Sequence, residues 1–205
     1  MDREPIRNRG ALRRSRHINR LPAVNVHHAS RYSERIGLPL NTFITVNLTA
    51  LGVAAAASTV FRKLLAQRFA PWLRRGSPQA RLISPTYVWS IEAAGNVTAA
   101  HWLVHLPESL VSQFAMKLGA WLEGLSGEKV LHETVQMKPI YNLVGIRRYI
   151  LKGVNPAWAE HLGVKAVDQG IVNGKRSGFS KNLGPTARKA GGYKPKRVPP
   201  KMSSV

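Results

Sequence analysis

Apolar positions in the middle of the chain follow two spacings, one typical of strands and one typical of helices. Short runs rich in β-branched and aromatic residues predict strands at 42–48, 86–91, 98–106 and 130–137. Apolar residues at every third or fourth position predict helices at 50–75, 107–124 and 141–153. Gly95 and Asn96 predict a tight turn that joins the second and third strands as a hairpin.

This order of elements, β-α-β-β-α-β-α, predicts an α+β fold. We expect a ferredoxin-like βαββαβ antiparallel sheet with helices on one face and an added C-terminal helix. The predicted domain covers residues 41–155. Apolar periodicity is weak on either side of it, so we expect a flexible basic arm at 1–40 and a flexible basic tail, rich in glycine and proline, at 156–205.

The net charge of the chain indicates which kind of molecule it binds. It has 31 lysine and arginine residues against 10 acidic ones, a formal net charge of +21, which favours a polyanion and nucleic acid above all. Cysteine is absent, which excludes disulfides and thiolate metal sites. No apolar run is long enough for a membrane span, and the first residues lack the apolar core of a secretory signal. We therefore expect a cytoplasmic protein.

The helix predicted at 141–153 carries the first candidate chemistry. At helical spacing, Tyr149 and Lys152 lie on the same side, next to a stripe formed by Leu143, Ile146 and Ile150 that can pack on a core. A phenol ordinarily loses its proton only near pH 10, so a nucleophilic tyrosine needs help from neighbouring charges.

Three pieces in this order resemble the HUH endonucleases, specifically the rolling-circle replication initiators of bacterial plasmids and phages. The pieces are the strand TFITVNL, the hairpin that ends in HWLVHLP, and the Tyr-x-x-Lys helix, and together they cover roughly residues 41–155. The resemblance implies that Tyr149 is the nucleophile and that Lys152 positions the phosphate. It also implies that Glu92 and His101 bind a divalent cation, Mg²⁺ or Mn²⁺, and that no other cofactor is needed.

The chain departs from the family at one metal position. The family pattern has two histidines in the hairpin, but seven residues after Glu92, where the first one belongs, this chain has Ala99. Strand alternation places Ala99 and His101 on one face, so one imidazole of the pair is missing from that face. A glutamate with one histidine can still bind Mg²⁺ or Mn²⁺ weakly, because these ions retain water and accept phosphate oxygens as ligands.

The resemblance implies a replication initiator, a metal-dependent tyrosine DNA endonuclease and strand transferase that nicks and rejoins single-stranded origin DNA. Its partner would be single-stranded DNA or an origin hairpin, with a host helicase as a further candidate partner. One alternative is an impaired protein of the same fold that binds origin DNA without cleaving it. Another is a basic RNA-binding protein. The segment 170–176 resembles a phosphate-binding loop but is one residue short and lacks the following Ser or Thr, so we expect no ATP site there.

Overall fold

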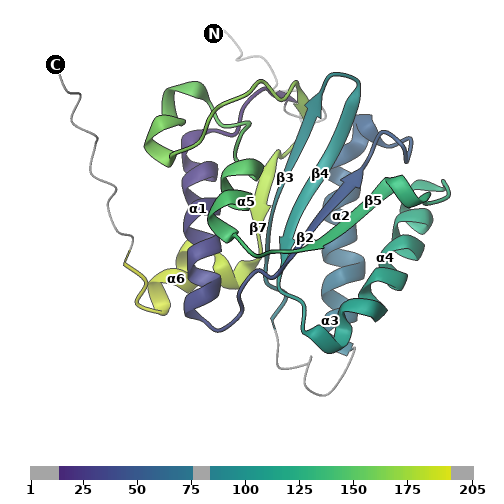
Figure 1. Cartoon of the computed structure of the whole chain (residues 1–205), viewed down its shortest axis with the longest axis horizontal. Helices are drawn as coiled ribbons and strands as arrows, with labels where there is room; N and C mark the ends of the chain where they lie inside the picture. The colour runs from purple at the N-terminus through teal and green to yellow at the C-terminus, as the bar shows by residue number, and fades with distance from the viewer. Residues whose placement is uncertain (1–13, 76–83, 195–205) are drawn as a thin grey trace, which may run out of the picture.

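The computed structural model describes residues 14–75 and 84–194 of the chain. A five-stranded antiparallel sheet lies at its centre, with helices on both faces (Figure 1). In sheet order the strands are β5 (Val135–Pro139), β2 (Thr42–Asn47), β4 (Val97–Val104), β3 (Tyr87–Ala94) and β7 (Ser177–Phe179). The α+β class and the antiparallel sheet are therefore confirmed, whereas the expectation that helices cover one face only is wrong.

One face of the sheet carries the larger core. It is covered by α2 (Ala57–Lys63), a π-helical turn η2 (Leu64–Phe69), α3 (Ala70–Arg75) and α4 (Val111–Ser126). Phe61, Phe69 and Phe114 from these helices are fully buried and pack edge-on around Trp102 of β4. Burying each such side chain contributes on the order of 1.5–3 kcal/mol. This core fixes β3 and β4, whose alternate residues face the opposite side of the sheet.

The opposite face is covered by α1 (Arg20–Arg35), α5 (Leu143–Ile150) and α6 (Pro185–Ala190), which lie together on the left of Figure 1. The prediction of a flexible arm at 1–40 is therefore wrong for α1, and residues 1–13 lie outside the described part. Ala23, Val26 and Ala29 repeat at helical spacing and are completely or almost completely buried. These small residues give a weak apolar signal, which arginines and serines obscure in the sequence.

The prediction of a flexible tail at 156–205 is also wrong for its central part, while the cationic residues Lys196, Arg197 and Lys201 lie outside the described range. β7 adds to the sheet beside β3, and β6 (Val172–Asn173) pairs with β1 (Arg14–Ser15) in a small second sheet. A Cβ at Gly178 would lie 2.8 Å from the Trp89 ring, so only glycine lets β7 approach β3 this closely.

Short 3-10 turns complete the chain, at Ala54–Ala56, Glu108–Leu110, His132–Thr134, Pro156–Trp158, Glu160–Leu162 and Lys181–Leu183. The turn at His132–Thr134 delays β5 to Val135, five residues after the predicted start of that strand. In the described part of the chain, no helix combines the length and the apolar character needed to cross a bilayer.

Candidate functional site

Strand alternation places a group of polar side chains on the face of the sheet that α5 covers. Ile91 and Trp102 point into the larger core, so their neighbours Glu92 and His101 point to the other side. In the register of the hairpin, His101 pairs with Ser90 and Glu92 pairs with Ala99, so Glu92 and His101 are diagonal neighbours. Diagonal pairs lie about 7–8 Å apart at their Cα atoms, close enough for long side chains to meet.

The helix α5 positions the phenol over these strands. The side chain of Asn142 caps the helix by accepting a hydrogen bond from the Gly145 amide at 2.9 Å. Ile150 is buried in the smaller core and fixes the rotation of the helix. Tyr149 then faces the sheet beside His101 and keeps 41% of its surface exposed, which leaves its phenol accessible to a substrate.

The structure brings together all four residues that the sequence analysis selected. Nε2 of His101 lies 3.0 Å from Oε1 of Glu92, and Nζ of Lys152 lies 2.8 Å from Oε2 of the same carboxylate. The rings of His101 and Tyr149 are 5.0 Å apart between centroids and nearly perpendicular. Lys152 Nζ is 4.1 Å from the centre of the Tyr149 ring, a cation–π distance. The chain therefore links the phenol, the imidazole, the ammonium and the carboxylate in one cluster.

The charges of Glu92 and Lys152 stabilise each other. Burial raises the pKa of Glu92, but its contacts with His101 and Lys152 outweigh burial and lower the pKa from 4.5 to about 2. Burial likewise lowers the pKa of Lys152, but Glu92 and Tyr149 more than compensate and raise that pKa above its ordinary value. At neutral pH the carboxylate and the ammonium are therefore both charged. The side chain of Glu92 is only 17% exposed, so water screens this pair weakly.

A second residue on β2 orients the imidazole. Oγ1 of Thr45 lies 3.2 Å from Nδ1 of His101, and the ring of Phe43 stacks on the other side at 5.8 Å. His101 Nε2 is buried and makes no aligned hydrogen bond within the described residues, although it lies close to Glu92. A contact at Nδ1 fixes the orientation of the ring and leaves Nε2 as the nitrogen that could bind a metal, which is how second-shell residues orient ligating histidines.

Glu92 and His101 offer two donor atoms that a divalent cation could take as ligands. Adjacent ligands of an octahedral ion with bonds of about 2.1 Å lie about 3.0 Å apart, which matches the Glu92–His101 separation of 3.0 Å. Ala99 lies opposite Glu92 and offers no donor atom, and Lys152 holds the second carboxylate oxygen. Among the described residues, no group of three or more histidine and acidic side chains could hold a metal. Water and phosphate oxygens would have to complete the coordination.

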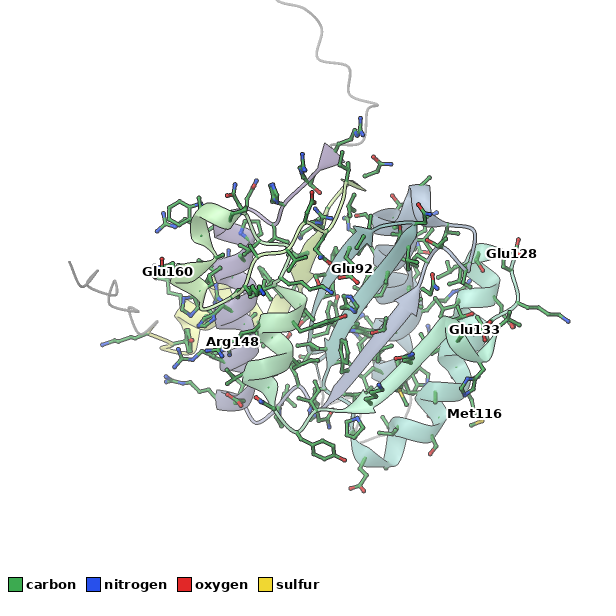
Figure 2. The ribbon with its side chains drawn as sticks, turned by 45° about the horizontal axis from the view of Figure 1, so that its top comes forward. Glu92, Met116, Glu128, Glu133, Arg148 and Glu160 are labelled. Carbon is green, nitrogen blue, oxygen red and sulfur yellow. The ribbon has the colours of Figure 1, made fainter. Side chains whose placement is uncertain are left out.

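The surroundings show which residues the sequence analysis missed. Thr45 lies in the strand predicted at 42–48 and was not selected, yet its alternation with Ile44 and Val46 already places it on the same face as His101. Figure 2 shows Glu92 in the middle of the molecule beside α5, whereas Glu128, Glu133 and Glu160 lie toward its edges. Glu92 is therefore the acid that the fold places beside the phenol.

The tryptophans have mainly structural surroundings. Trp89 and Trp102 are buried in the larger core, where they cannot stack on bases. Trp158 is half-buried, and the guanidinium of Arg20 lies 4.5 Å from the centre of its ring. Arg20 therefore covers one face of the Trp158 ring.

No family model, no curated protein and no solved structure matches this chain, so the geometry of the cluster carries the functional conclusion.

Proposed function

We propose that this protein is a tyrosine DNA endonuclease and strand transferase of the HUH type, which initiates rolling-circle replication by nicking and rejoining single-stranded origin DNA. The observation that carries the proposal is the placement of Tyr149 over the Glu92–His101 pair with Lys152 beside it. The strand order β5-β2-β4-β3 and its two helical connections support a ferredoxin-like βαββαβ unit, to which α5 adds the catalytic helix.

The phenol is the nucleophile of the proposed reaction. The Tyr149 oxygen attacks the phosphorus of a phosphodiester, a new P–O(tyrosine) bond forms, and the P–O3′ bond breaks. The proton that the phenol loses is balanced by the proton that the departing 3′ oxygen gains. The 5′ phosphate remains on the enzyme as a phosphotyrosine ester, and a later 3′-hydroxyl can attack it in the reverse direction and rejoin the strand.

The neighbours of Tyr149 supply charge and orientation. Lys152 approaches the phenol ring to 4.1 Å, so its ammonium can offset the negative charge that develops on the phosphate and the phenol oxygen. Glu92 and His101 would hold a Mg²⁺ or Mn²⁺ ion, and Thr45 fixes the imidazole for that role. When bound, such an ion polarises the scissile phosphate.

A covalent trapping experiment tests the proposal. Random-sequence single-stranded oligonucleotides with a label at the 3′ end are incubated with the protein and Mn²⁺, and the products are separated under denaturing conditions. Attack by Tyr149 transfers the 3′ fragment, with its label, to the protein. We expect a labelled band for the wild type and for Tyr141→Phe, whose phenol is 92% exposed just before α5, and none for Tyr149→Phe.

Ala99 favours a second candidate, a protein of the same fold that binds the origin without cutting it. With a methyl group opposite Glu92, the metal site has lost one protein donor. If this candidate is right, the wild type retards the labelled DNA in a native gel but gives no covalent band. A preference for structured RNA over single-stranded DNA at matched salt would favour the third alternative, a basic RNA-binding protein.

A further inference from the structure

A basic cleft of about 550 Å³ lies between the first described residues of the chain and the segment at 174–177. We call it the terminal cleft; residues 14–19 and Pro22 form one wall, and residues 174–177 form the other. Arg14, Arg16 and Lys175 are exposed along it. Its walls join segments about 160 positions apart in the sequence, and the pairing of Arg14 with Asn173 holds them together.

The floor of the terminal cleft is a rigid polar structure. Arg176 is only 4% exposed, and its guanidinium donates hydrogen bonds to five backbone carbonyls. The acceptors belong to Ser15, Arg16, Ile91, Gln169 and Gly170. The guanidinium of Arg176 therefore binds backbone carbonyls and is not available to a ligand. These hydrogen bonds also fix the positions of the exposed residues next to it.

The terminal cleft adjoins both halves of the candidate active site. On one side, the Ile18 amide donates to the Gly153 carbonyl at 2.8 Å, one residue after Lys152. On the other side, the Ile91 amide donates to the Arg176 carbonyl at 2.8 Å, one residue before Glu92. Segments paired in this way lie about 5 Å apart. A single DNA strand that leaves the candidate site on this side would therefore pass directly onto the terminal cleft.

The basic side chains of the terminal cleft differ in whether an acidic side chain already neutralises their charge. Arg16 donates to Asp168 at 2.7 Å, so its charge is partly neutralised. Within the described residues, neither Arg14 nor Lys175 forms an ion pair with an acidic side chain. Two exposed charges held on a rigid floor, with no internal partner, are suited to contacts with the phosphates of a nucleic acid.

We propose that the terminal cleft holds the backbone phosphates of the single DNA strand that flanks the scissile phosphate, with Arg14 and Lys175 as the principal contacts. This inference rests on the proposed function for the identity of the ligand. It places this DNA contact on a folded part of two segments that the sequence analysis expects to be flexible. It also requires residues 14–19 and 174–177 to fold against each other before the flanking DNA strand can bind.

The salt dependence of binding tests this proposal. The affinity for a fluorescent single-stranded oligonucleotide is measured by anisotropy over a range of NaCl concentrations. Because each phosphate contact on a single strand contributes about 0.7 to the slope of log K against log [NaCl], we expect the double variant Arg14→Gln/Lys175→Gln to reduce its magnitude by about 1.4. Lys129→Gln/Lys189→Gln removes the same charge from exposed positions in the loop after α4 and on α6, neither of which lines the cleft, and is expected to leave the slope close to the wild-type value.

The outcomes separate this proposal from the nuclease itself. Equal slopes for the two double variants, or an equal loss of slope on a double-stranded oligonucleotide, would overturn the assignment of the cleft to a flanking single strand. Arg14→Lys keeps the charge and should keep the slope, which controls for damage to the fold. If the wild type forms the covalent band while the two double variants have equal slopes, the nuclease proposal stands and the cleft proposal fails. If only Arg14→Gln/Lys175→Gln loses slope and the wild type forms no covalent band, the cleft binds single-stranded DNA and the nuclease proposal fails.

Discussion

Replacing Glu92 with glutamine isolates the energetic role of the carboxylate in the cluster. The substitution preserves the shape of the side chain and removes the charge that faces His101 at 3.0 Å and Lys152 at 2.8 Å. These two partners are the reason that the pKa of Glu92 falls to about 2 despite burial. Because a lowered pKa means that folding favours the ionised acid, the wild type should be more stable than Glu92→Gln at neutral pH.

The size of the effect follows from the pKa. A fall from 4.5 to about 2 is about 2.5 units, and at 1.36 kcal/mol per unit this sets a ceiling of about 3.4 kcal/mol. The side chains of Glu92 and Lys152 are 17% and 23% exposed, so water screens part of the interaction, and glutamine keeps some hydrogen bonding. We therefore expect Glu92→Gln to reduce the free energy of unfolding by about 1–2 kcal/mol at pH 7.

Urea unfolding at a series of pH values measures this difference. The contribution of Glu92 is complete above the unfolded pKa of 4.5 and is lost as pH falls through the folded pKa of about 2. The gap between wild type and Glu92→Gln should therefore be constant from pH 7 to about 4.5 and shrink below it. Glu160→Gln, at an exposed acid on the periphery, is expected to show little difference at any pH. A gap for Glu92→Gln that persists unchanged to pH 2 would refute the ion-pair interpretation.

Three further substitutions test other parts of the structure. Arg176→Met leaves backbone carbonyls without their donor and should lower the free energy of unfolding by about 3 kcal/mol in urea titrations. An effect below about 1 kcal/mol would contradict the conclusion that the hydrogen bonds of Arg176 hold these segments together. Thr45→Val removes the hydroxyl at His101 Nδ1 and should weaken Mn²⁺ binding about tenfold by calorimetry, with little change expected if the hydroxyl has no orienting role. Ala99→His restores an imidazole opposite Glu92 and should strengthen Mn²⁺ binding and speed formation of the covalent band. Unchanged affinity and rate would count against the correspondence of Ala99 to the first histidine of the family pattern.

The central elements could be predicted because their apolar patterns are strong and local. The hairpin β3–β4 follows from alternation around Gly95, and α4 follows from large apolar residues at helical spacing. The terminal elements could not be predicted in this way. α1 buries small residues such as Ala23 and Ala29, and β7 is only three residues long. Their order depends on contacts with the sheet, which sequence periodicity does not report.

In the candidate site, too, contacts between residues close in the sequence could be predicted and contacts between distant residues could not. Tyr149 and Lys152 share a helical turn, so their proximity follows from local geometry. Their approach to Glu92 and His101 depends on how α5 packs on the sheet, which helical spacing alone does not determine. Thr45 is 56 positions away from His101 along the chain. Only the pairing of β2 with β4 joins the two, and no spacing within either strand indicates that contact.

The pairing of β1 with β6 has a consequence for synthesis of the protein in the cell. The two strands are separated by more than 150 positions, so β1 cannot pair with β6 during synthesis until most of the chain has left the ribosome. Contacts of such long range also slow folding, because closing a large loop costs entropy before the contact forms. A nascent chain that is released early, before residue 172, would leave the outer edge of β3 open to other chains. Premature termination is therefore expected to produce aggregation instead of a shortened folded protein.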